Sequence, residues 1–404
     1  MKLLAGILAL AMNVQPAPAP TERSSRDLIA EQQLPIARTS AGYGGAGWDR
    51  LVADGEAAQF FMIGEQHATA DIALFATALH AELARRGYTH AALEVGPYST
   101  GFAESLIRSG RGRLAEYIRR PGHNFTLPFL FFQEEVDLAE QIVAASPDRE
   151  RALWGVDQEF VGSGPIALAL LERHASTPEQ REALARFARR VRAEPMLAGQ
   201  LSAAELDPLA RAFAGQREAS GLIEALGLSS EIYRPFLRRD GPTYPANLRR
   251  ENYMKANFLR HFAEAERRLG SPPRVFLKFG GYHAMRGHSG TNVPAFGNFL
   301  AEWGLSRGFG LVNMMVDCDG GQALNPQTNE VGPCEPYFGP GTVIGSMARA
   351  DAMTLIDLRP LRAQLPRMHD LDPLTRQTIL AFDYYVVIKD VRAATPVATL
   401  PPRQ

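Results

Sequence analysis

A glutamate and a histidine follow a short apolar run near residue 60, and this pair is the clearest chemical feature of the chain. Phe60 to Ile63 are apolar, Gly64 permits a tight turn, and Glu65 and His67 come next. In an open α/β sheet, ligands bind in the crevice beyond the carboxyl ends of the strands. A carboxylate and an imidazole placed there can exchange protons with a substrate or bind a metal ion. The pattern therefore favours an enzyme over a scaffold.

Three further strand-like runs end in residues of the same kinds. They are 90–95 with Glu94, 152–157 with Asp157 followed by Glu159, and 274–279 followed by Gly280, Gly281, Tyr282 and His283. A single carboxylate at a strand end more often caps the next helix than takes part in catalysis. However, the carboxyl ends of parallel strands lie along one edge of a sheet, so we expect these side chains to converge in one cleft.

A long amphipathic segment, 245–269, carries a second group of polar residues. Arg250, Met254, Asn257 and His261 recur at i, i+4, i+7 and i+11, which is one face of a helix. An arginine and an asparagine that share a face with methionine suggest a partly buried polar edge. The alternative is a solvated arginine on a long surface helix, and the spacing alone does not decide between the two.

The periodicity of the chain predicts an α/β fold with a mainly parallel sheet flanked by helices. Strand-like and helical segments alternate from residue 48 to 163 and again from 239 to 395. Later strands are expected at 310–316, 353–356 and 384–388. Between the two parts, residues 164–238 have helical spacing and no strand pattern. We therefore predict a discontinuous core, 48–163 and 239–395, with an inserted all-helical subdomain at 164–238.

Composition and charge give no sign of a nucleic-acid partner. The chain has 404 residues, of which 46% are hydrophobic and 22% charged, and its formal net charge is −1. These values are ordinary for a globular protein, and such a charge produces no field that attracts nucleic acid or anionic lipid. The arginine-rich stretch 181–190 has apolar residues at helical spacing, which favours a solvated helix face.

The N-terminus is typical of an export signal. Lys2 is followed by the apolar stretch 3–12 and by Ala17-Pro18-Ala19, a small-x-small cleavage pattern. We predict a signal peptide at 1–19, a flexible leader at 20–47, and a periplasmic or secreted mature protein without a stable membrane anchor. The alternative is that the apolar stretch forms a short helix of the mature fold.

Two cysteines agree with that compartment. Cys318 and Cys334 bracket a stretch rich in Gly, Asn and Pro. A disulfide that closes a loop of this length contributes roughly 3 kcal/mol by restricting the unfolded chain. A metal-binding pair is the alternative, but the CxxC spacing is absent.

Taken in order, these motifs resemble the erythromycin esterase-like superfamily, which also takes in Tiki-type metalloproteases and haem-binding lipoproteins of the ChaN type. The resemblance spans roughly residues 48 to 310. The matching stretches are Gly64-Glu65-Gln66-His67, Ala92-Leu93-Glu94, Trp154-Gly155-Val156-Asp157, Arg250-Glu251-x-x-Met254-x-x-Asn257 and Gly280-Gly281-Tyr282-His283.

The resemblance implies an α/β core with a helical insertion over the site, and hydrolysis of an ester or lactone without a metal ion. His67 would be the general base on water, oriented by Glu65 and Glu94, while His283 and Arg250 would stabilise the oxyanion. Substrate contacts are expected from Asp157, Glu159, Asn257 and Tyr282. The first motif reads Glu-Gln-His where macrolide esterases commonly show Glu-Ser-Thr-His, and the second lacks their His-Asn before the Gly. The fold is therefore better supported than a macrolide substrate.

Two alternatives keep the same cleft and change its chemistry. Glu65, His67, Glu94 and His283 form a nitrogen and oxygen ligand set for a divalent metal ion, as in the Tiki-type relatives. A haem-binding protein would instead use His67 or His283 as an axial ligand. The haem-binding relatives tend to be lipoproteins, and this chain lacks a lipidation Cys near its N-terminus. The sequence specifies neither the physiological substrate nor the oligomeric state.

Overall fold

A computed structural model describes most of the chain. The described residues are 23–40, 42–146, 151–194, 196, 199–239, 241–325, 328, 330–337, 341–348 and 353–399. The predicted signal peptide, 1–19, lies outside them. Within the described residues, no helix is both long and apolar enough to span a bilayer.

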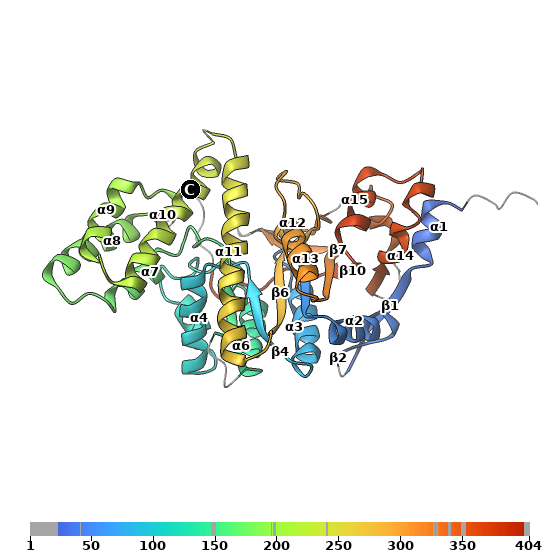
Figure 1. Cartoon of the computed structure of the whole chain (residues 1–404), viewed down its shortest axis with the longest axis horizontal. Helices are drawn as coiled ribbons and strands as arrows, with labels where there is room; N and C mark the ends of the chain where they lie inside the picture. Colours follow the sequence, from blue (N-terminus) through green and yellow to red (C-terminus); the bar gives the residue numbers. More distant parts are fainter. Residues whose placement is uncertain are drawn as a thin grey trace, which may run out of the picture.

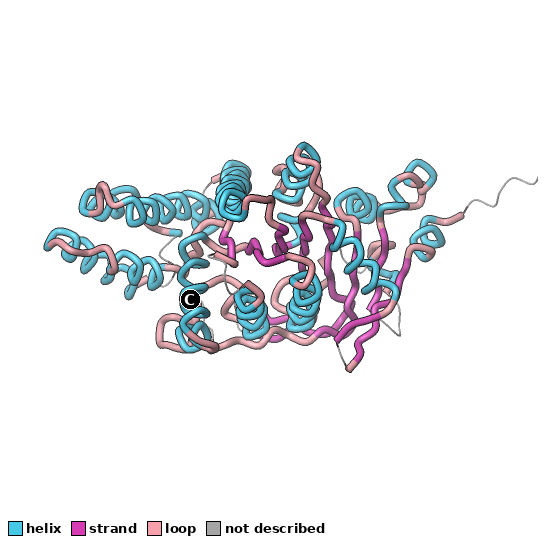
Figure 2. The backbone as a smooth tube through the Cα atoms, turned by 60° about the horizontal axis from the view of Figure 1, so that its bottom comes forward, coloured by secondary structure: helices cyan, strands magenta, loops and turns pink. Residues whose placement is uncertain are grey.

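The described residues form one mixed sheet of ten strands (Figures 1 and 2). The strands are β1 (Gln33–Thr39), β2 (Gly42–Gly44), β3 (Phe60–Glu65), β4 (Tyr88–Leu93), β5 (Leu153–Gly155), β6 (Arg274–Gly280), β7 (Leu311–Asn325), β8 (Glu330–Pro333), β9 (Met353–Asp357) and β10 (Tyr384–Val391). Their order is β2-β1-β9-β10-β7-β3-β6-β4-β5, and β8 pairs with β7 outside this path. The neighbours from β10 to β5 are parallel, whereas β1, β2, β8 and β9 pair antiparallel. This confirms the predicted fold class.

Helices cover both faces of the sheet, which explains why its central strands are mostly apolar. On one face lie α2 (Ala46–Ala57), α3 (Ala70–Ala84), α4 (Pro97–Ser109), α5 (Arg113–Ile118) and α6 (Gln133–Ala144). On the other lie α1 (Ser25–Ala30), α11 (Tyr244–Leu269), α13 (Phe296–Ser306), α14 (Arg359–Arg362) and α15 (Pro373–Ala381). In β3, Phe61 and Ile63 join the first core, while Phe60 and Met62 join the second. Because successive side chains of a strand point to opposite faces, both faces of β3 are buried.

The predicted helical insertion contains α7 (Gly164–Glu172), α8 (Pro178–Ala193), α9 (Ala203–Ala212) and α10 (Arg217–Arg238). These helices lie on the side of the molecule opposite to β1 and β2 (Figure 1). They bury a small apolar cluster of their own, which includes Leu171, Phe187, Phe213 and Leu226. Capping boxes at Thr177 and Ser202 start α8 and α9, as their Thr-x-x-Gln and Ser-x-x-Glu patterns indicate.

The flexible leader predicted at 20–47 is wrong for the residues that the structure describes. This region contains α1, β1 and β2, and β1 pairs antiparallel with β9. Only Ile36 of β1 is fully buried, so the segment lacks the apolar alternation by which strands are recognised. Its strand conformation depends on hydrogen bonds to a segment more than 300 residues away in the sequence.

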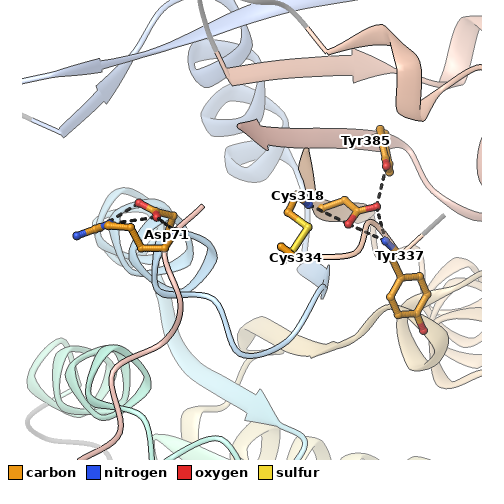
Figure 3. Close-up of a disulfide and its surroundings, with 7 residues drawn as sticks. Asp71, Cys318, Cys334, Tyr337 and Tyr385 are labelled. Atoms are coloured by element: carbon orange, nitrogen blue, oxygen red, sulfur yellow. Dashed lines mark hydrogen bonds and ion pairs between the residues drawn. A yellow bond between two sulfur atoms is a disulfide. The ribbon is translucent and has the colours of Figure 1, made fainter. Parts of the chain in front are cut away.

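Cys318 and Cys334 form the predicted disulfide, which ties β7 to the segment after β8 (Figure 3). Asp317 fixes the surroundings of the bridge. Its carboxylate accepts hydrogen bonds from the amides of Cys318 and Tyr337 at 2.9 Å and from the Tyr385 hydroxyl at 2.8 Å. The disulfide therefore joins a hairpin that is also held by a buried carboxylate.

Candidate active site

The parallel register brings the polar strand ends together at one edge of the sheet. Strands β3, β6, β4 and β5 are neighbours in this order. Glu65 of β3 lies opposite Gly280 of β6, and Leu93 of β4 lies opposite Lys278 of β6. The structure therefore brings together the predicted residues Glu65, Glu94, Asp157 and His283. Their hydrogen bonds and ion pairs fall into two groups.

The first group centres on a buried lysine. Nδ1 of His67 lies 3.0 Å from Oε1 of Glu65, and Oε2 of Glu65 lies 2.6 Å from Nζ of Lys278. The same Nζ lies 2.6 Å from Oε1 of Glu135, on α6. The Lys278 and Glu65 side chains are only 3% and 5% exposed, whereas His67 is 37% exposed. His67 is thus the member of this group that a substrate can reach.

Charges in the first group set its protonation states. Burial disfavours the ionised Glu65, but the charge of Lys278 and the hydrogen bond with His67 outweigh it and lower the pKa of this carboxyl. Burial opposes a charged imidazole too, yet the hydrogen bond with Glu65 and the charges of Glu65 and Glu94 raise the pKa of His67. When His67 is neutral, its Nδ1–H donates to the ionised Glu65, and Nε2 is the free proton acceptor.

The second group centres on Glu94. Its Oε1 lies 2.7 Å from an Nη2 of Arg250 and 3.3 Å from Nε2 of His283, and its Oε2 accepts the Gly280 amide at 2.7 Å. Arg250 also makes a two-pronged contact with Asp157, at 2.9 and 2.5 Å. Nδ1 of His283 lies 2.6 Å from Oε1 of Glu251. The arginine of the long helix is therefore part of the site and is not a solvated surface residue.

The second group is charged at neutral pH. Burial would neutralise Glu94, but His283 and Arg250 hold the pKa of its carboxyl well below its usual range. Burial lowers the pKa of His283, whereas Glu94 and Glu251 overcome this effect and raise it to about 10. Since His283 stays protonated near pH 7, it cannot accept a proton there and instead presents a positive charge.

Two cavities meet at His67. The inner one, of about 20 Å³, has residues of both groups in its wall, namely His67, Glu65 and Lys278 of the first and Glu94 of the second. The outer one, of about 890 Å³, also has His67 in its wall and extends to the β7–β8 hairpin. Phe129 lines both cavities and packs against the His67 ring, with centroids 4.6 Å apart and the rings tilted by 32°. A third cavity, of about 880 Å³ between α4, α10 and α11, has none of these residues in its wall.

Of the four residues predicted to contact the substrate, the structure places one in the charged groups of the site and the other three outside them. Asp157 lies in the site, paired with Arg250. Glu159 instead accepts the amides of Tyr98 and Ser99 at the start of α4, which is a helix-capping role. Asn257 is buried and donates to the carbonyl of Val156. Tyr282 is 43% exposed and packs edge-on against Tyr337.

Several residues of the site were not singled out from the sequence. Lys278 stands within an apolar strand pattern. Because a lysine is seldom buried without a charged partner, its position in the sequence indicates a buried ion pair. Glu135 offers no local signal, because its partner is 143 residues away. Tyr233 of α10 is under the influence of the site, since burial and the charge of Asp157 both raise the pKa of its phenol. The helical insertion thus reaches the Asp157 side of the site.

The alternative metal ligands do not fit a divalent cation as they lie. Both oxygens of Glu65 are paired with His67 and Lys278, and those of Glu94 with Arg250, His283 and the Gly280 amide. A cation would have to displace a lysine or an arginine from its carboxylate. In the described part of the chain, no group of three or more His, Cys, Asp or Glu side chains is arranged to hold a metal ion.

The fold and this edge define an α/β protein with a buried ionic site at the carboxyl ends of its parallel strands. Its fold is similar to that of solved structures that include an erythromycin esterase, in agreement with the α/β fold that the resemblance implied. A mutant of the erythromycin esterase EreC in its open conformation superposes with a TM-score of 0.58 at 16% identity, covering 88% of this chain and 95% of that one.

Two further solved structures are similar over nearly their whole length. One is a Bacillus cereus protein, with a TM-score of 0.60 at 14% identity, covering 93% of this chain and 100% of its own. The other is described as a succinoglycan biosynthesis protein, with a TM-score of 0.60 at 16% identity, covering 92% and 97%. No family model and no curated protein matches the chain.

The buried lysine can be tested by its effect on stability. We expect Lys278→Met to lower the free energy of unfolding by about 3 to 5 kcal/mol at pH 7, because it leaves Glu65 and Glu135 buried without their cation. The two carboxyls would then have raised pKa values, and the folded state would bind more protons than the unfolded state. The stability of this variant should therefore fall as the pH rises from about 4 to 7. Urea unfolding across this range measures both effects.

Lys389→Met is the matched control, since Lys389 is 36% exposed and lies 3.6 Å from Asp319 at the surface. We expect it to change stability by less than about 0.5 kcal/mol. Equal losses in the two variants would contradict the assignment of Lys278 as the cation that allows the carboxylates to be buried.

Proposed function

We propose that this protein is a hydrolase that cleaves an ester or lactone by a water molecule activated by His67. The observation that carries the proposal is the His67 imidazole, held through Nδ1 by an ionised Glu65 and partly exposed to a large cavity. A base needs a proton acceptor within reach of water and a partner that orients it. The likeness to the fold of an erythromycin esterase supports the reaction class, and the substrate is part of the proposal.

The attacking water is proposed to occupy the inner cavity. Its volume of about 20 Å³ suffices for a single water molecule. The wall offers the polar partners that such a water needs, in His67, Glu94, Glu65 and Lys278. His67 accepts the proton as the water oxygen attacks the carbonyl carbon, and the resulting imidazolium is stabilised by Glu65. The same imidazolium then returns the proton to the leaving alcohol.

His283 and Arg250 are proposed to stabilise the oxyanion of the tetrahedral intermediate through their positive charge, because both ring nitrogens of His283 already contact carboxylates. Both groups are positively charged at neutral pH, since their carboxylate partners raise their pKa values. Their fixed partners, Glu251 for His283 and Asp157 for Arg250, hold these charges in place before the substrate arrives. Preorganised charge of this kind needs no rearrangement at the moment of reaction.

We further propose that the protein is exported. The Cys318–Cys334 disulfide supports this, because structural disulfides persist mainly in oxidising compartments. The predicted signal sequence at 1–19 is the other support.

Removal of the base is the direct test. His67→Ala should lower kcat/KM by about 10²- to 10⁴-fold on a panel of small esters and macrolactones, the usual contribution of general base catalysis. His288→Ala is the control, because His288 is exposed and outside both groups of the site. Circular dichroism establishes that each variant is folded. A folded His67→Ala protein with undiminished hydrolysis would remove His67 from the mechanism.

The pH profile should be bell-shaped. His67 must be neutral to act, so activity should rise as the pH passes its pKa, which lies above the ordinary 6.5. His283 must stay protonated, so activity should fall as the pH passes about 10. Glu94→Gln removes a charge that raises the pKa of His67 and should move the acid limb to lower pH. NMR titration of His67 gives the same shift where the variant is too slow to assay, with Glu302→Gln as the surface control.

The space around Nε2 of His67 can be tested with a single methyl group. A Cβ at Gly280 would lie 2.6 Å from this nitrogen, although the backbone there (φ −59°) suits any residue. Gly280→Ala should displace the imidazole and lower kcat/KM by about 100-fold, the usual effect of a small misplacement of a reacting group. Gly101→Ala, where a Cβ meets nothing within 4 Å, should leave kcat/KM unchanged. Equal activity of the two variants would show that Nε2 does not face Gly280.

A further inference from the structure

We propose that the outer cavity binds a bulky, uncharged apolar group of the substrate, and that the disulfide-closed β7–β8 hairpin forms one wall of this binding site. The inference rests on the proposed function only in taking His67 as the reacting base. The cavity, of about 890 Å³, has the size typical of sites for small molecules. At about 30 Å³ per water-sized atom, it has room for roughly thirty non-hydrogen atoms.

One wall of the cavity is aromatic. It consists of Phe129, Phe131 and Phe132, from the segment that precedes α6. The ring of Phe129 packs against that of His67, so the apolar wall begins at the proposed base. An apolar group bound here would place a neighbouring carbonyl within reach of Nε2.

The opposite wall is the β7–β8 hairpin. It can reach the cavity because β7 continues past the end of β3, its neighbour in the sheet. The last residue of β3, Glu65, pairs with Val316, and β7 continues to Asn325. These nine further residues of β7 pass the end of β3, and those up to Gly321 still pair with β10 on the other side. Leu324 of this extension and its partner Val331 of β8 line the cavity, together with Pro333. The exposed carboxylates of Glu330 and Glu335 also line the cavity and disfavour an anionic substrate.

The hairpin is anchored to the residue next to His67. The carbonyl of Ala68 accepts hydrogen bonds from the amide of Leu324 at 3.1 Å and from that of Ala394 at 3.0 Å. These two bonds hold Ala68 in a left-handed conformation, with φ of 65°, that a non-glycine residue seldom adopts. Phe129 has φ of 61° on the other side of His67. Strained backbone of this kind persists where the surroundings fix it and is concentrated at functional sites.

The disulfide fixes the same wall from its far end. Cys334 is bonded to Cys318 and its amide donates to the carbonyl of Gly321 at 3.0 Å. The hairpin is therefore held at its base by a covalent bond and near its tip by Ala68. A wall that is rigid before binding lowers the entropy cost of association.

The test measures binding separately from catalysis. N-phenyl-1-naphthylamine, a neutral aromatic fluorophore, is titrated into the intact protein and into His67→Ala, and we expect saturable binding to both. Val331→Asp places a charge in the apolar wall and should raise the Kd about tenfold or more, because that charge resists burial. Val331 is 52% exposed, so the substitution does not disturb the core. Leu305→Asp, at a 76% exposed position of α13, should leave the Kd unchanged.

A series of p-nitrophenyl esters tests the substrate class. The kcat/KM value should rise from the acetate to the benzoate and naphthoate, and the loss in Val331→Asp should grow along the series through KM. The Cys318→Ser/Cys334→Ser double variant should weaken fluorophore binding by loosening the wall. An unaltered Kd and an unaltered ester series in both variants would overturn the inference. If the intact protein still hydrolysed the esters, the proposed function would stand. Fluorophore binding without hydrolysis of any ester would overturn the proposed function and leave the binding site standing.

Discussion

The need to pair buried charges at the end of the parallel strands determines much of this structure. Glu65, Glu94 and Glu251 are each less than 7% exposed, and an unpaired carboxylate at such a site would cost several kcal/mol. Lys278 of β6 supplies the compensating charge for Glu65, Arg250 of α11 for Glu94, and His283 for Glu251. This explains why a lysine stands in an apolar strand and why a long polar-faced helix packs against the sheet edge. The chemistry of the two histidines follows from the same pairing, because their pKa values are raised by these carboxylates.

The sheet and the convergence of its polar ends could be predicted because they depend on local patterns. Apolar runs buried on both faces are short and continuous, so β3, β4 and β6 stand out, and Gly64 and Gly280 mark where they end. Once the strands are parallel, Glu65, Glu94 and His283 must share an edge. No detailed knowledge of packing is needed for this step. The disulfide followed similarly from two cysteines that bracket a Gly-, Asn- and Pro-rich stretch, although the structure places the end of β7 and all of β8 in that stretch.

The features that could not be predicted, such as β1 and the role of Glu159, depend on contacts between distant segments. β1 is a strand only through its pairing with β9, and its own residues are half-exposed. Glu159, like Asp157, is a carboxylate that follows a strand. However, it accepts hydrogen bonds from the amides of Tyr98 and Ser99 and caps the start of α4. Burial raises the pKa of Glu159 to about 7, and its hydrogen bonds with Ser99 and Tyr98 only partly oppose this effect. Two carboxylates on one short segment thus acquire different roles from their partners.

The position of His67 between two cavities follows from the unequal lengths of neighbouring strands. β3 ends at Glu65, whereas β7, its neighbour on one side, continues for nine residues, and β6, its neighbour on the other side, turns at once into α12 (Gly281–Ala284). One flank of His67 is therefore closed by Gly280 and the buried ionic groups, and the other opens toward the hairpin. The proposed hydrolysis would use both flanks, with the water on the closed one and the apolar part of the ester on the open one. The part of β7 beyond Gly321, which pairs with β8 and no longer with a parallel strand, forms a wall of the outer cavity in this arrangement.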